Sequence, residues 1–290
     1  MADFNDQGSA DVMDVWDHRT FQPDILDVLE SHGDMICAYF TTENAIFLEH
    51  DMGRGSGRGM LRPRNPYSGA YLDLCERLGD RLLKETIRAY HYTRLIDAEV
   101  ADLRRSGIHI STETSLRRRL DAMVASANLN PDLAASLYAE SPLHCDQHDA
   151  RTGKFWMNSN PVPVDDHKVM PLMARWGGEV ASFAVSDEGM LKPLGDIGRA
   201  RVIEVAAPLE ATQQAYSASQ AAIATFARFL GAAPDKSDFD LYVRKPLPAT
   251  AVLAVHTEGE PSFAQMGKSY PAGYVDVSAG YWKELTGEDD

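Results

Sequence analysis

The chain has 290 residues, of which 44% are hydrophobic, and it carries a formal net charge of −15 at neutral pH. This length and composition allow one large domain or two small ones, each with a full core. The negative charge argues against a general nucleic-acid binder, because such proteins present a basic surface to the phosphates.

The cysteines and the apolar segments indicate where the protein works. Cys37, Cys75 and Cys145 are odd in number and widely spread, so they form no disulfide framework and suit a reducing compartment. The acidic, polar run after Met1 lacks the apolar core of a signal peptide. No stretch approaches the roughly 18 consecutive apolar residues of a membrane span. The sequence therefore predicts a cytoplasmic protein without a membrane partner.

The first 85 residues are predicted to lie outside the main domain. Residues 1–20 are rich in Asp, Gly and Ser, which is typical of a loose acidic arm. Residues 21–85 form an N-terminal extension or cap. Its apolar pattern predicts a short helix from residue 23 to 33, strands at 35–40 and 44–50, and a helix at 70–87.

A glycine- and arginine-rich segment, Gly-Arg-Gly-Ser-Gly-Arg-Gly at 53–59, interrupts the extension. Glycines let backbone amides approach phosphates, and the arginines would add positive charge. The spacing matches neither a Walker loop nor a dinucleotide fingerprint, so the segment predicts a basic surface loop. In so acidic a chain it is the best candidate for contact with nucleic acid or a phosphorylated target.

The rest of the chain, 86–290, begins with helices and continues mainly with strands. Helices are predicted at 97–106, 111–129 and 212–231, with a short one starting at Asn130-Pro131. Strands are predicted at 89–93, 154–158, 179–185, 201–206, 238–243 and 250–256. The absence of regular βαβ alternation predicts an α+β fold on a mixed or antiparallel sheet.

Two of these strands carry polar side chains beside apolar ones. Because side chains alternate along a strand, His91 and Thr93 share one face and Tyr92 points to the other. In the strand at 238–243, Asp240 points away from the face that buries Leu241. A lone strand histidine is usually structural and a strand aspartate often just faces solvent, so periodicity alone gives neither residue a function.

The segment 90–112, which contains His91-Tyr92-Thr93, a helix and Gly107, resembles the opening of ADP-ribosyltransferase-fold proteins. The resemblance is to the bacterial toxin-like families with a His-Tyr-Asp or His-Tyr-Glu signature. Residues 153–161 resemble the second motif of these families, an aromatic pair on a strand. Residues 240–255 resemble the third, an acidic residue at the start of a late strand that is followed by a proline turn.

The resemblance implies an ADP-ribosyltransferase-like split mixed or antiparallel sheet with flanking helices over 86–290, and NAD as co-substrate. The protein would transfer ADP-ribose to a macromolecular acceptor, protein or nucleic acid, as a bacterial toxin or defence effector with an antitoxin as a further partner. The residues that the resemblance places in the NAD site are the catalytic Asp240, with His91, Tyr92, Thr93, Arg94, Phe155 and Trp156 as NAD contacts.

Each of these residues has an implied role. His91 would hydrogen-bond the adenosine ribose, and Thr93 with its adjacent backbone would hold the carboxamide region. Phe155 or Trp156 would stack on the nicotinamide ring. Asp240 would stabilise the positive charge that develops on the ribose as the glycosidic bond breaks. The pyrophosphate would meet an arginine, either Arg94 or one of the run 117–119, a run that a solvated helix face explains equally.

The chain departs from the family pattern at two of these positions, which keeps alternatives open. Phe155 replaces a tyrosine and lacks its hydroxyl, and Asp240 replaces the longer glutamate. An NAD glycohydrolase and an inactive nucleotide-binding module are therefore alternatives. A third is a metal-dependent hydrolase that uses His144 and His148, whose spacing would suit zinc on a helix. The segment 143–149 is predicted as a loop and lacks a general-base glutamate, so no metal is expected.

Overall fold

The computed structural model describes residues 12–53, 61–144, 148–183 and 185–287. These residues divide into two compact units. Unit 1 contains residues 86–212 and 240–268, and unit 2 contains residues 12–85, 213–239 and 269–287. The stretch predicted as one catalytic domain, 86–290, is therefore shared between the units.

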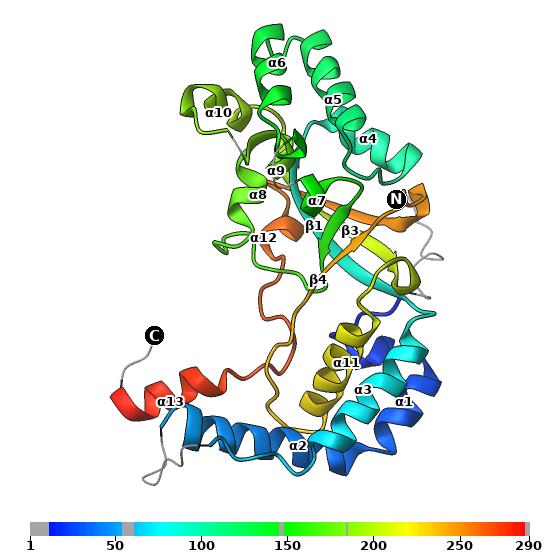
Figure 1. Ribbon diagram of the computed structural model, residues 1–290, viewed down its shortest axis with the longest axis vertical. Helices are drawn as coiled ribbons and strands as arrows, with labels where there is room; N and C mark the ends of the chain where they lie inside the picture. The colour runs from blue at the N-terminus through cyan, green and yellow to red at the C-terminus, as the bar shows by residue number, and fades with distance from the viewer. Residues whose placement is uncertain (1–11, 54–60, 145–147, 184, 288–290) are drawn as a thin grey trace. The chain divides into compact units, whose positions relative to one another are not determined.

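Unit 1 is built on a five-stranded sheet (Figure 1). The spatial order is β4-β2-β1-β3-β5, and every neighbouring pair is antiparallel. The predicted α+β class is confirmed, and so are five of the predicted strands. The strand bounds are Thr86–Leu95 for β1, Phe155–Asn158 for β2, Arg199–Pro208 for β3, Asp240–Val243 for β4 and Val252–Thr257 for β5.

The register of the strands sorts their side chains onto two faces. Directly opposed residues of an antiparallel pair point to the same side of the sheet. Thr93 pairs with Arg201, and Arg201 with Thr257. The "His91 face" therefore includes Ala89, His91, Thr93, Phe155, Met157, Arg201, Ile203, Val205, Leu241, Val243, Val255 and Thr257.

The opposite side is named here the "Tyr92 face". Tyr90 is opposite Asn158, which in turn is opposite Asp240. Its centre is covered by the short helices α8 (Met170–Ala174) and α12 (Pro261–Ala264). These helices and the chain between β2 and α8 bury an apolar cluster of Tyr90, Tyr92, Val162, Val169, Met173, Ala200, Val202, Phe263 and Met266.

A second cluster of unit 1 lies among helices that follow β1 in the chain. These helices are Glu113–Ala125 (α5), Pro131–Ala139 (α6), Pro142–His144 (η3), Gly178–Ser182 (α9) and Glu188–Gly195 (α10). The same stretch of the chain also contains α4 (Asp97–Ser106) and α7 (His148–Arg151). The predicted helix start at Asn130-Pro131 is confirmed, because the Asn130 side chain accepts from the Leu133 amide at 2.7 Å. Trp176, Leu120 and Leu137 are fully buried in this cluster.

The predicted strand at 179–185 is wrong, because the chain forms α9 over most of its length. A short apolar run fits a buried strand and a buried helical turn equally, and only its surroundings decide. Here Gly177 and Gly178 both adopt positive φ angles and turn the chain into the helix. Ala181 then packs into the cluster around Trp176.

Unit 2 is helical. Its elements are η1 (His18–Thr20), α1 (Pro23–Glu30), α2 (Gly33–Ile46), η2 (Phe47–Asp51), α3 (Ser68–Leu82), α11 (Ala215–Phe229) and α13 (Val277–Thr286). Helices α3 and α11 lie side by side (Figure 1), and a Cβ at Gly79 would come within 3.5 Å of the Ala215 carbonyl oxygen. Gly79 therefore permits a close approach of the two helices.

Two predictions for unit 2 differ from the structure. The strands predicted at 35–40 and 44–50 are wrong, because α2 and η2 run through both segments. The buried residues Ile36 and Phe40 are one helical turn apart, and the polar residues 41–43 that separate the two apolar runs continue the same helix. Within the predicted loose arm, Met13 and Val15 are fully buried. In the described part of the chain, no helix combines the length and apolar character that a bilayer crossing requires.

Candidate functional site

The imidazole of His91 is held by a main-chain group of the neighbouring strand. Its Nδ1 lies 2.8 Å from the carbonyl oxygen of Trp156. A carbonyl oxygen only accepts, so Nδ1 carries the proton and the neutral ring presents Nε2 as an acceptor. The Phe155 ring lies beside it, with a centroid separation of 4.3 Å. His91 therefore offers an oriented hydrogen-bond acceptor next to the largely buried ring of Phe155.

The surroundings of His91 keep its ring uncharged. Burial lowers the pKa of His91 to about 4, the hydrogen bond to Trp156 opposes this shift, and the positive charge of Arg119 lowers the pKa further. At neutral pH the ring is therefore the neutral species. A neutral acceptor favours a ligand hydroxyl rather than a carboxylate or phosphate at this atom.

Arg119, on α5, is fixed close to His91 by two side chains. Its Nε donates to Glu99 Oε1 at 2.8 Å, and its guanidinium carbon lies 4.9 Å from the centroid of the Trp176 ring. Trp176 Nε1 donates to the other oxygen of Glu99 at 2.9 Å. Arg119 Nη2 is buried and has no hydrogen-bond partner within the described residues. Within the described part of the chain, this buried donor is therefore unsatisfied.

The predicted arginine run 117–119 is thus resolved into three different roles. Only Arg119 is one of the groups that shift the pKa of His91. Arg117 stacks on Tyr138, with its guanidinium carbon 3.5 Å from the ring centroid. Arg118 is exposed. The solvated helix face that the sequence offered as an alternative describes the exposed Arg117 and Arg118 but not the partly buried Arg119.

The segment Trp-Gly-Gly-Glu at 176–179 lies next to Thr93. Thr93 is buried on the His91 face, and a Cβ at Gly178 would come 3.9 Å from its Oγ1. The following residue, Glu179, accepts from Arg151 Nη2 at 3.2 Å and keeps a half-exposed side chain. Sequence reasoning missed this segment because it assigned Glu179 to a strand. The consecutive glycines before a glutamate are the signal that could have drawn attention to it.

Tyr92 and Arg94, both predicted to contact NAD, serve the packing of unit 1. The Tyr92 hydroxyl donates to the Val162 carbonyl at 2.8 Å and accepts from the Val162 amide at 2.6 Å. Burial raises the pKa of this phenol. Arg94 Nε donates to the Ile197 carbonyl at 3.0 Å, and its Nη1 lies 3.8 Å from Glu258. Their polar groups are thus engaged within the fold.

Trp156 and Asp240 lie on the Tyr92 face, away from His91. The Trp156 ring is 4.6 Å from Tyr242, and its Nε1 donates to the Ala150 carbonyl at 2.9 Å. Asp240 is exposed and accepts from Asn158 Nδ2 at 2.9 Å. The structure therefore brings His91, Thr93 and Phe155 together and leaves Asp240 on the other side of the sheet.

The two histidines considered for a metal belong to separate elements, η3 and α7. His144 Nδ1 is 3.8 Å from Glu113, and His148 Nδ1 is 3.3 Å from Asp149. Among the residues that the structure describes, no group of three or more His, Cys, Asp or Glu side chains is arranged to hold a metal ion. The predicted basic loop at 53–59 lies, apart from Gly53, outside the described residues.

Comparison of the chain with protein-family models, with curated proteins and with solved structures finds no match. The resemblance to ADP-ribosyltransferases therefore rests on the three sequence motifs.

Proposed function

We propose that unit 1 binds NAD on the His91 face and transfers its ADP-ribose to a macromolecular acceptor. The observation that carries this proposal is the state of His91. The ring is neutral, its Nδ1 proton is committed to the Trp156 carbonyl, and its Nε2 is an acceptor beside Phe155. A ribose hydroxyl needs such an acceptor, and a nicotinamide ring can pack on a neighbouring aromatic side chain.

The reaction in this proposal breaks the bond between the ribose and the nicotinamide nitrogen. Nicotinamide leaves with the bonding electron pair, and positive charge develops on the ribose ring. A carboxylate close to that ring would stabilise the transition state more than the ground state, which is what accelerates the reaction. The acceptor nucleophile then forms the new bond to the ribose carbon and loses its proton.

Glu179 is the carboxylate that the proposal places in this role, instead of the Asp240 expected from the sequence. Asp240 points to the Tyr92 face. Both oxygens of Glu99 are engaged, by Arg119 and by Trp176. Glu179 directly follows Gly178, which lies against Thr93, and its half-exposed carboxylate can reach a ligand.

Nicotinamide release from NAD tests the proposal, with Glu179→Gln and Asp240→Asn as a matched pair. Loss of a group that stabilises transition-state charge costs about 100-fold or more in rate. We expect that loss for Glu179→Gln, and a rate within about twofold of wild type for Asp240→Asn. The reverse result would restore Asp240 as the acid and contradict the placement of the reaction on the His91 face.

NAD labelled in its adenosine moiety separates the transferase from its alternatives. Label that moves to a protein or nucleic acid in a bacterial extract supports transfer. Nicotinamide release without labelled acceptor identifies an NAD glycohydrolase. Binding of NAD without any release identifies an inactive nucleotide-binding module.

A further inference from the structure

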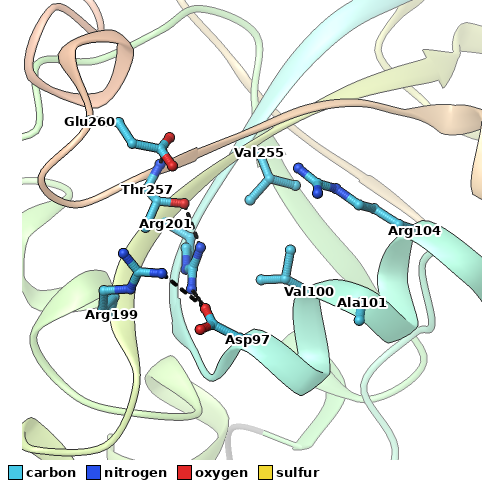
Figure 2. Close-up of a pocket in the computed structure, with 9 residues that line it drawn as sticks. All are labelled: Asp97, Val100, Ala101, Arg104, Arg199, Arg201, Val255, Thr257 and Glu260. Atoms are coloured by element: carbon cyan, nitrogen blue, oxygen red, sulfur yellow. Dashed lines mark hydrogen bonds and ion pairs between the residues drawn. The ribbon is translucent and has the colours of Figure 1, made fainter. Parts of the chain in front are cut away.

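A pocket of about 490 Å³ lies between α4 and the strands β3 and β5 of unit 1 (Figure 2). It opens on the His91 face but on the β3–β5 half of the sheet, whereas the Trp156 and Phe155 partners of His91 come from β2. Its volume lies in the range of small-molecule sites. The lining residues are Asp97, Val100, Ala101, Arg104, Arg199, Arg201, Val255, Thr257 and Glu260.

Arg201 lies at the centre of this pocket and is almost completely buried, with 5% of its side chain exposed. Its Nη1 donates to Thr257 Oγ1 and its Nη2 donates to Asp97 Oδ1. Its Nε is buried and has no hydrogen-bond partner among the residues that the structure describes. A buried guanidinium with an unsatisfied donor is costly unless another group supplies the missing contact.

Positive charge exceeds negative charge around the pocket. The three arginines of the lining face only two carboxylates. One carboxylate oxygen of Glu260 is already engaged, because Oε2 accepts a hydrogen bond from the Thr257 amide at 2.9 Å. Asp97 accepts from Arg199 at 3.1 Å as well as from Arg201. Arg104 forms no ion pair with any described residue, and Figure 2 shows it at the rim of the pocket.

Asp97 occupies the position that an external anion would take. Its carboxylate lies between Arg199 and Arg201 (Figure 2), yet 78% of its side chain is exposed. Hydrogen bonds from Arg199 and Arg201 lower the pKa of Asp97. The exposed side chain can turn into solvent and release both guanidinium groups.

We propose that this pocket binds a small molecule that carries a phosphate group, and that Asp97 competes with the phosphate for Arg199 and Arg201. A planar guanidinium presents paired donors that match phosphate oxygens. Val100, Ala101 and Val255 add an apolar wall for the rest of the ligand. A purely structural ion pair would account for Asp97 and Arg199 but would leave the buried Nε of Arg201 unsatisfied.

Titration calorimetry with inorganic pyrophosphate at constant ionic strength tests the site in the full chain. We expect Arg199→Gln and Arg104→Gln each to weaken pyrophosphate binding about tenfold, because each removes one charged donor. Asp97→Asn should strengthen binding about threefold or more, because it removes the competing carboxylate. These opposite changes distinguish the site from a general loss of structure.

Arg105→Gln is the matched control. Arg105 lies on α4 next to Arg104, is exposed, and pairs with Asp102 instead of lining the pocket. The substitution Arg105→Gln removes one positive charge, as Arg104→Gln does, and should leave the affinity for pyrophosphate unchanged. The proposal is overturned if wild type does not bind millimolar pyrophosphate, if Arg105→Gln weakens binding as much as Arg199→Gln, or if Asp97→Asn leaves binding unchanged or weaker.

This inference does not rest on the proposed use of NAD. Pyrophosphate has no ribose and no nicotinamide, so its binding is measured independently of His91 and Glu179. If the protein binds pyrophosphate in the expected pattern but releases no nicotinamide from NAD, the phosphate site is supported and the transferase proposal is contradicted.

Discussion

His91 shows how one residue gains a defined chemical state from its neighbours. The hydrogen bond from Nδ1 to the Trp156 carbonyl fixes both the orientation and the tautomer of the ring. Trp156 supplies this bond through its main chain, while its side chain points to the opposite face of the sheet. Of the aromatic pair that the sequence indicated, the Phe155 ring therefore lies beside His91, whereas the Trp156 ring lies on the other face and only its carbonyl contacts His91.

At the residue scale, the low pKa of His91 predicts a loss of stability in acid. The native ring has a pKa of about 4, whereas an unfolded histidine has a pKa of about 6.5. Between these values the unfolded chain binds a proton that the native chain does not, so stability falls as the pH is lowered from 6.5 toward 4. Above pH 6.5 the ring is neutral in both states, and His91 no longer makes stability depend on pH.

His91→Asn measures this contribution, because the Asn amide can still donate to the Trp156 carbonyl but does not titrate. From pH 7 to pH 4.5, the free energy of unfolding of wild type should fall by about 2 kcal/mol more than that of His91→Asn. This figure is below the full shift because the ring keeps partial contact with water. Urea unfolding at both pH values checks this difference, and equal losses in the two proteins would contradict the low pKa of native His91.

At the scale of elements, Gly107 lets the end of α4 pack against the turn that precedes β5. It ends α4 with a φ of 86°, and a Cβ there would overlap the carbonyl of Leu247 and the backbone of Pro248. The Ile108 amide also donates to the Leu247 carbonyl, at 2.9 Å. The close approach of these two backbone segments therefore requires glycine.

Gly107→Ala should lower the free energy of unfolding by at least about 2 kcal/mol, because positive φ and a backbone clash act together. Gly153→Ala is the control, since Gly153 has a φ of 68° but no atom within 4 Å of its Cβ position. It should cost only about 1 kcal/mol, from φ strain alone. Chemical denaturation compares the two, and equal costs would show that the clash at Gly107 relaxes freely.

Strand pairing also shows what sequence reasoning can reach. Alternation along single strands predicted correctly that His91 and Thr93 share a face and that Asp240 points away from Leu241. Whether a side chain of β4 lies on the same face as one of β1 depends on the register of β2, which lies between them. A shift of one residue moves every side chain to the other face, and no local pattern fixes it over such sequence distances. The sequence therefore could not show that Asp240 and His91 are on opposite faces.

At the scale of the whole molecule, the α+β class and most elements followed from local patterns. The division into units did not. Helix α11 was predicted at nearly its observed position, but it packs with α3 of the N-terminal extension. Such partnerships join segments far apart in the chain, and burial of complementary apolar faces decides them. The strands predicted at 35–40 and 44–50 were wrong because short apolar runs fit a strand and a helix equally, and here Ile36, Phe40 and Ile46 are buried on one helix.

The central claim is that NAD binds to the His91 face of unit 1 through Nε2 of His91. Titration calorimetry of NAD at pH 7.5 into wild type, His91→Asn and Asp240→Asn tests it most directly. Wild type and Asp240→Asn should bind NAD with the same affinity. His91→Asn should bind about tenfold more weakly, because the shorter side chain places no acceptor at the position of Nε2. Absence of NAD binding to wild type, or a loss of affinity in Asp240→Asn but not in His91→Asn, would contradict the claim.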